Sequence, residues 1–135
     1  MHVSNTDRLA LEQGMRRLAK REYQSVHAES IELIKRNVSD PVPYFLLGIL
    51  ASDHNNYAKA VELFRQSIAY DSSNPIVHAY LAKVLTTLNQ QADARDVAQR
   101  GAALPIKEAF TADMLGVVFS RTGFHSDAAP LFEKA

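Results

Sequence analysis

Residues 41–74, PVPYFLLGILASDHNNYAKAVELFRQSIAYDSSN, decide the fold of this chain. Apolar and small side chains recur there at steps of three and four residues, first at Tyr44, Leu47, Gly48 and Ala51, then at Tyr57, Ala60, Phe64 and Ile68. This spacing is typical of two amphipathic helices, and the polar residues 54–56 between them predict a turn. The stretch therefore reads as one helix-turn-helix unit in which each helix has a face to bury.

The same pattern returns along the chain at a constant period and without an insertion. Adding 34 to the residue number takes Gly48 to Ala82 and then to Gly116, and subtracting 34 gives Gly14. Phe64 becomes Ala98 and then Phe132, while Ala60, Ala94 and Ala128 share one position and Tyr23 and Tyr57 another. Since one helix pair has too little core to stand alone, in-phase repetition predicts stacked pairs that bury a shared core.

The period and these residues resemble the tetratricopeptide repeat family, whose pattern includes W-x2-L-G-x2-Y, a later A-x3-F and a closing proline. Tyr44 stands at the family's tryptophan position, Leu47 and Gly48 match its Leu-Gly pair, and Phe64 matches its aromatic. The resemblance implies an all-α, right-handed superhelical solenoid of antiparallel helix pairs. It covers residues 7–135 as about four repeats, with a concave face that family members use for binding.

We expect a flexible amino terminus at 1–6, and then repeats at 7–40, 41–74, 75–108 and 109–135, the last one incomplete. Eight helices are predicted, including helices at about 7–20, 23–37, 76–88 and 92–103, with turns near 21–22, 38–40, 54–56, 71–74, 89–91, 104–107 and 122–126. Gly123 is expected to adopt a positive φ in the last turn. The last helix should take Asp127 as its cap, because Pro130 has no amide hydrogen to donate.

Composition and charge exclude several classes of function. The chain has 15 basic and 15 acidic residues, so its formal net charge is zero, which disfavours a nucleic-acid groove or a polybasic membrane anchor. A basic cluster, Arg16, Arg17, Lys20 and Arg21, is best explained as a solvated helix end. No basic and apolar leader begins the chain, and we expect a cytoplasmic protein.

No pattern of catalytic or metal-ligating residues stands out. The chain has no cysteine, and its five histidines do not pair at the i, i+4 spacing of a helical metal site. His78 takes the aromatic position of Tyr44, which is a packing role. The sequence therefore predicts no cofactor, no metal and no enzymatic activity in these residues.

The resemblance implies a partner-binding groove lined by the first helix of each repeat. Transferring the groove positions of the family gives Arg8, Leu11, Met15, Phe45, Ile49, Asp53, Lys83, Phe110, Asp113, Val117 and Arg121. An open groove with this apolar floor suits an amphipathic helix or an extended apolar segment, and binding would depend weakly on salt. The alternative is a superhelix that closes until these apolar side chains bury one another.

Two functions remain open from the sequence. The first is a protein–protein interaction module that holds a peptide or partner segment in the concave groove. The second is the amino-terminal repeat arm of a larger bacterial enzyme, such as a sulfotransferase or glycosyltransferase, whose catalytic domain lies beyond residue 135. The reading frame downstream of Ala135 separates them. The chain's end also suggests self-association through an uncapped last repeat that exposes parts of Val118, Leu131 and Phe132.

Overall fold

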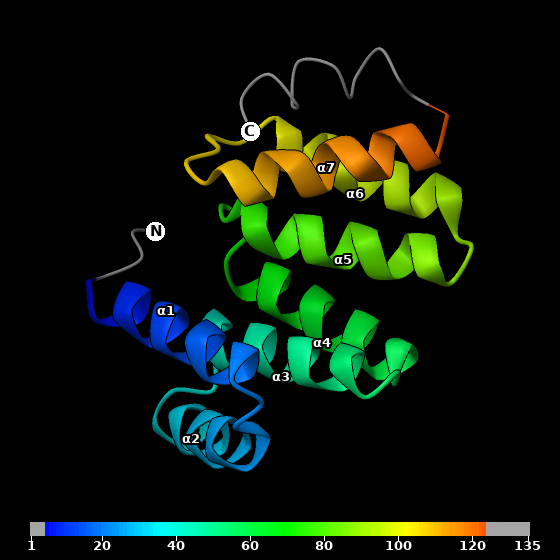
Figure 1. Cartoon of the computed structure of the whole chain (residues 1–135). Helices are drawn as coiled ribbons and strands as arrows, with labels where there is room; N and C mark the ends of the chain where they lie inside the picture. The colour runs from blue at the N-terminus through cyan, green and yellow to red at the C-terminus, as the bar shows by residue number, and fades with distance from the viewer. Residues whose placement is uncertain (1–4, 124–135) are drawn as a thin grey trace. The chain divides into compact units, whose positions relative to one another are not determined.

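The computed structural model describes residues 5–123 as helices joined by short turns, without a strand in that range. Figure 1 shows the order of the elements along the chain. The helices are α1 (Asn5–Ala19), α2 (Tyr23–Arg36), α3 (Pro41–Asp53), α4 (Tyr57–Tyr70), α5 (Pro75–Thr87), α6 (Gln91–Ala102) and α7 (Ala109–Arg121). The predicted all-α fold is confirmed.

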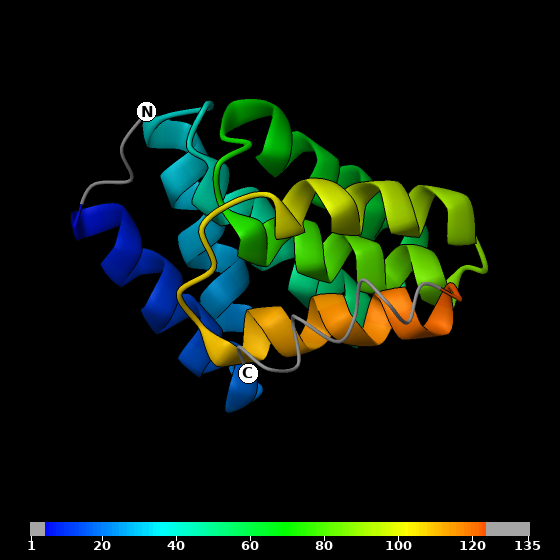
Figure 2. The same cartoon turned by 90° about the horizontal axis from the view of Figure 1, so that it is seen from above.

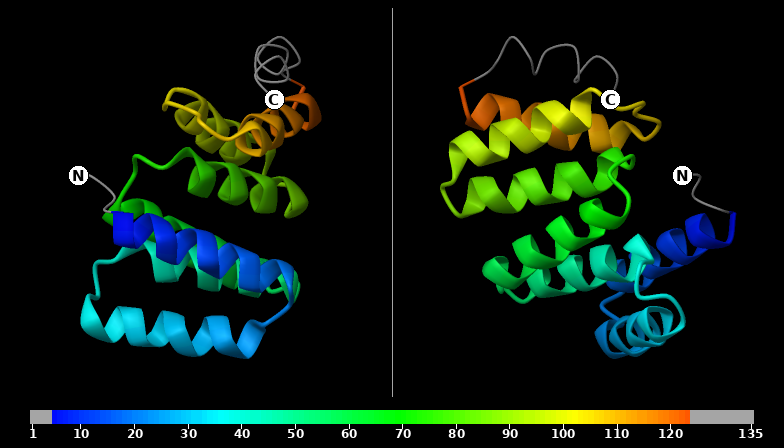
Figure 3. Two further views of the ribbon diagram at one scale, coloured as in Figure 1. Left: turned by 60° about the vertical axis from the view of Figure 1, so that its left-hand side comes forward. Right: turned by 180° about the vertical axis from the view of Figure 1, so that it is seen from behind.

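The chain divides into two compact units, Met1–Asp71 and Ser72–Ala135. In the first unit α3 and α4 form a tightly packed pair, and α1 and α2 both contact α3. In the second unit α5 pairs with α6, and α7 packs against both. Figure 2 shows α5 and α6 running side by side, and Figure 3 shows the α3–α4 pair from two further directions.

A close approach of two helices forms the core of the α3–α4 pair. Gly48 of α3 faces the ring of Phe64 of α4, and a Cβ added to Gly48 would lie 2.5 Å from Phe64 Cε1. Phe64 is fully buried, and its ring packs against that of Phe45 at a centroid distance of 5.8 Å. The missing side chain of Gly48 therefore makes room for an aromatic ring.

The α5–α6 pair uses different residues at the same positions. Ala82 and Ala98, which lie one repeat period after Gly48 and Phe64, are both fully buried. A second close approach lies nearby, where a Cβ added to Gly101 would stand 2.8 Å from the Cβ of His78. In this pair, small residues on both helices replace the glycine and the aromatic ring of the preceding pair.

The starts of α3 and α5 follow from their caps. The side chain of Asp40 accepts a hydrogen bond from the amide of Val42 at 3.0 Å, and Asn74 accepts one from Ile76 at 3.0 Å. A proline follows each cap at the first helical position, where its missing amide hydrogen costs nothing. Glu108, the equivalent residue before α7, makes no such bond from its side chain.

The turn inside each helix pair is a backbone motif that recurs in phase. Arg21, Asn55, Asn89 and Gly123 adopt positive φ values of 62°, 62°, 61° and 84°, and each lies one repeat period after the one before. After each of the first three, the next amide donates to the carbonyl five residues back, as from Asn56 to Ala51 at 2.8 Å. This is the Schellman arrangement that ends many helices. The positive φ predicted for Gly123 is confirmed.

Side chains also tie the first helix of a pair to the segment before it. The hydroxyl of Tyr44 donates to the carbonyl of Val38 at 2.7 Å. His78 holds the same position in the next repeat, where it is 4% exposed and places Nε2 at 2.9 Å from the carbonyl of Ser72, the equivalent of Val38. The packing role predicted for His78 is confirmed, and the structure adds a hydrogen bond to it.

Most helix boundaries lie within two residues of the prediction. The first helix begins at Asn5, inside the segment that we expected to be flexible, and the other described helices begin close to the predicted residues. The eighth helix, with Asp127 as its cap, lies outside the described residues, as do Leu131 and Phe132. Val118 was expected to be partly exposed. That prediction is wrong, because the residue is 2% exposed on the buried face of α7.

Candidate partner-binding surface

The predicted groove residues fall into three groups by exposure. Leu11, Phe45 and Ile49 are buried, whereas Met15 and Val117 are half-buried. Phe110 is 44% exposed. The charged members Asp53, Lys83, Asp113 and Arg121 are exposed, while Arg8 lies in α1 with its side chain outside the described part of the chain.

The buried group corrects the expected apolar floor in the first unit. Phe45 is 1% exposed because it packs against Phe64 inside the α3–α4 pair. Ile49 and Leu11 are 7% and 8% exposed. At this exposure the three side chains offer almost no surface to a partner, which agrees with the burial alternative, and the second-helix ring of Phe64 packs against Phe45.

The exposed group concentrates on α7. Phe110, Asp113, Val117 and Arg121 follow one another at steps of three and four residues, so they lie along one face of the helix. The opposite face is buried through Ala112, Leu115, Val118 and Phe119. We call the four exposed-face residues the α7 stripe. Lys83 of α5 occupies the position of Val117 one repeat earlier, and it is exposed as well.

The α7 stripe combines apolar and charged groups. An aromatic ring at Phe110 and the half-buried Val117 alternate with the carboxylate of Asp113 and the guanidinium of Arg121. Arg121 is exposed in the last turn of α7, where a cation is also favoured by the helix dipole. Such a face can hold an apolar side chain and orient it with one acidic and one basic contact.

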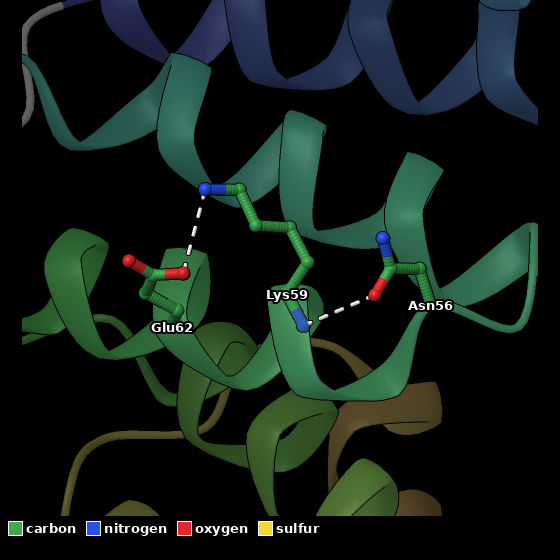
Figure 4. A network of polar contacts seen from close by, with 3 residues as sticks. All are labelled: Asn56, Lys59 and Glu62. Carbon is green, nitrogen blue, oxygen red and sulfur yellow. Dashed lines mark hydrogen bonds and ion pairs between the residues drawn. The ribbon is translucent and has the colours of Figure 1, made fainter.

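Two sets of polar contacts lie on the surface away from the α7 stripe. At the end of α1, Arg17 forms an ion pair with Glu29 of α2, which accounts for one member of the basic cluster. At the start of α4, Asn56 accepts from the amide of Lys59, and the ammonium of Lys59 lies 3.4 Å from Glu62 (Figure 4). Pairs of this kind on the surface contribute little to stability.

Titration of one buried group is perturbed. Burial raises the pKa of Tyr44 above its usual value, and the neighbouring Tyr70, whose ring centroid lies 5.3 Å away, raises it further.

The described residues contain no group of three metal-ligating side chains that could hold an ion. In the same part of the chain, every helix is too short or too polar to cross a membrane.

Comparison with known proteins rests on structure. No family model and no curated protein matches the sequence. A crystal structure of MamA superposes with a TM-score of 0.67 at 21% identity, covering 90% of this chain and 71% of that one. A MamA RS-1 ArsTM double mutant gives 0.67 at 17% identity over 98% and 75% of the two chains.

A further match identifies the class of fold. YrrB, a TPR protein with an unusual peptide-binding site, superposes with a TM-score of 0.67 at 20% identity. The match covers 78% of this chain and 54% of YrrB. Together with the constant repeat period, the helix pairs and the recurring turns, this shows that the chain has the tetratricopeptide-repeat fold.

Proposed function

We propose that this chain is a protein–protein interaction module that binds a segment of a partner protein across the α7 stripe, with Lys83 beside it. The observation that carries the proposal is Phe110, an aromatic side chain that is 44% exposed on a helix whose other face is fully packed. Large exposed aromatic groups are costly to leave in water, and phenylalanine is enriched at protein–protein interfaces relative to the rest of the surface.

The peptide-binding site of YrrB supports the same class of function, because its fold matches this chain over most of the described residues. The charges on the stripe indicate which groups the partner segment carries. A segment with an apolar side chain for Phe110, a basic group for Asp113 and an acidic group for Arg121 satisfies all three. An amphipathic helix presents groups at this spacing from one face.

The proposed floor differs from the one that the sequence indicated. Phe45, Ile49 and Leu11 contribute stability and not contact area, because they are buried. Of the predicted residues, Phe110, Asp113, Val117, Arg121 and Lys83 carry the proposal, and all five belong to the second unit. Since the charges of the stripe are mixed, binding should depend weakly on salt.

The experiment compares proteins captured by four immobilised versions of the chain: wild type, Phe110→Ala, Asp113→Lys and a control, Val38→Ala. Val38 is also a large exposed apolar residue, at 60%, and lies in the first unit. A genuine partner binds wild type and the control, and its affinity falls about tenfold or more with Phe110→Ala. All variants should keep the wild-type melting temperature. The proposal is refuted if the control variant loses binding, or if neither of the two stripe variants loses binding.

A further inference from the structure

The two charges of the α7 stripe are placed symmetrically about its central apolar residue. Asp113 lies four residues before Val117, and Arg121 lies four residues after it (117 − 113 = 121 − 117). Val117 is half-buried, and both charged side chains are exposed on the same side of α7. With a rise of about 1.5 Å per residue, the two charged residues lie about 12 Å apart along the helix axis.

Neither charge is neutralised by the other within one chain, because a separation of about 12 Å is far beyond the reach of an ion pair. The ion pairs found in the described part of the chain involve neither Asp113 nor Arg121. An acidic group and a basic group on one exposed helix face are therefore available to a partner that carries the opposite charges at the same spacing.

A second copy of α7 in antiparallel orientation carries those charges. When Val117 of one copy meets Val117 of the other on a two-fold axis, Asp113 of each copy faces Arg121 of the other, because both residues are equally far from the axis. The symmetry makes this contact occur twice. A parallel pairing would place acid against acid and base against base, which is repulsive. The charge pattern therefore favours the antiparallel pairing alone.

Phe110 fits the same arrangement. It lies three residues before Asp113, one helical turn away on the stripe, and is 44% exposed. The Arg121 side chain of the other copy, which faces Asp113, would therefore also lie beside the ring of Phe110. A guanidinium group is attracted to the face of an aromatic ring and donates hydrogen bonds to a carboxylate. Arg121 can thus contact the ring and the acid of the other copy together.

We propose that the partner of the α7 stripe is a second copy of this chain, paired through α7 across a two-fold axis at Val117. The pairing rests on the proposed function, because it names the occupant of the same surface. That surface calls for an amphipathic helix with an apolar, a basic and an acidic group on one face, and α7 itself presents all three. The contact is self-complementary, so it closes as a dimer.

Analytical ultracentrifugation of the full 135-residue chain measures this association. The mass of wild type should rise with concentration from 15.0 kDa towards that of a dimer. Asp113→Arg leaves two basic groups on the stripe, and Arg121→Asp leaves two acidic groups. Each variant alone should associate about tenfold or more weakly than wild type, because one reversal places like charges together at two contacts. An equimolar mixture of the two variants should recover association, because each basic group then faces an acidic one.

Two further variants test the orientation and the extent of the contact. A chain that combines Asp113→Arg with Arg121→Asp should self-associate again, since the exchanged charges keep their symmetry, but it should not pair with wild type. Lys83→Ala is the control. Lys83 is exposed on α5 and has no acidic group opposite it in this pairing, so the control should associate at least as tightly as wild type. Circular dichroism checks that every variant is folded.

The proposal is overturned if wild type keeps the monomer mass up to about 1 mM, or if it associates while the mixture of single variants fails to recover. The second result would assign self-association to another surface. Neither result decides whether the stripe binds a different protein, because the capture experiment with Phe110→Ala measures that separately. A failure of the self-pairing and a failure of the proposed function are therefore distinguishable.

Discussion

Gly48 and Phe64 form a pair whose coupling can be measured. Replacing Gly48 by alanine in the middle of a helix normally stabilises a protein by about 0.5–1 kcal/mol, because glycine loses more backbone freedom on folding. Here the new Cβ would lie 2.5 Å from Phe64 Cε1 and 2.6 Å from Cδ1. Ordinary contacts begin at 3.4 Å, so the deficit is 0.9 Å (3.4 − 2.5). The ring is fully buried, so moving it away from the new Cβ displaces the side chains packed around it.

Overpacking of this kind costs about 1–3 kcal/mol, which exceeds the gain in helix propensity. We expect Gly48→Ala to lower the free energy of unfolding by about 1–2 kcal/mol. Phe64→Ala alone should cost about 3–5 kcal/mol, because it leaves a cavity. In that background the alanine at 48 meets no ring, and it should stabilise by about 0.5–1 kcal/mol. The double-mutant cycle then gives a coupling of about 1.5–3 kcal/mol.

The third repeat supplies a precedent for the double variant, since Ala82 and Ala98 occupy the same two positions and are both buried. Urea unfolding followed by circular dichroism gives the four free energies, provided that the slope m stays constant. Gly14→Ala serves as the matched control. Its Cβ would meet the far end of the Leu46 side chain, which can rotate away, so its cost should stay below about 1 kcal/mol. Equal effects of Gly48→Ala in both backgrounds would refute the steric explanation.

Three further outcomes test the turns, the linker and the caps. Arg21 has φ 62° without the aid of glycine, so Arg21→Gly should raise the melting temperature, with a gain of about 0.5–1 kcal/mol; an unchanged or lower value would show that the turn carries no strain. Tyr44→Phe removes the bond to the carbonyl of Val38 and should cost about 1 kcal/mol at pH 7 in urea unfolding. Because the folded pKa of Tyr44 is raised, its stabilisation is complete below pH 10 and is lost as pH rises through that pKa, so the gap between wild type and Tyr44→Phe should narrow in alkali. Glu108→Asp gives α7 the cap that Asp40 gives α3, and it should add about 0.5–1 kcal/mol unless the amide of residue 110 stays unbonded.

The sequence predicted the helices well because their ends carry local signals. Asp40 and Asn74 each precede a proline, and both residues cap a helix as this order implies. Gly123 likewise indicated its positive φ. The same conformation at Arg21 was not predicted, since arginine carries no preference for a positive φ. Only the repeat period relates the position of Arg21 to that of Gly123.

The candidate site was harder to predict, since an apolar side chain at a groove position serves equally well in a core. Phe45 illustrates the ambiguity. From Val42 to Ser52, α3 contains no charged residue, which is typical of a helix buried on more than one side. That signal could have assigned Phe45 and Ile49 to the core. By contrast, Asp113 places a charge on the side of α7 opposite its buried face, and Phe110 on the same side is 44% exposed.

The turn with a positive φ that recurs once in every repeat also helps to explain how this fold can be kept while the amino-acid sequence changes. Its hydrogen bonds run between main-chain atoms, so substitution at Arg21, Asn55 or Asn89 removes no contact that reverses the chain. By contrast, a side chain added at a tight helix crossing changes the packing, because a Cβ on Gly48 would lie 2.5 Å from the ring of Phe64. The same fold is found at 20% identity in YrrB and at 21% in MamA, although no family model and no curated protein matches this sequence.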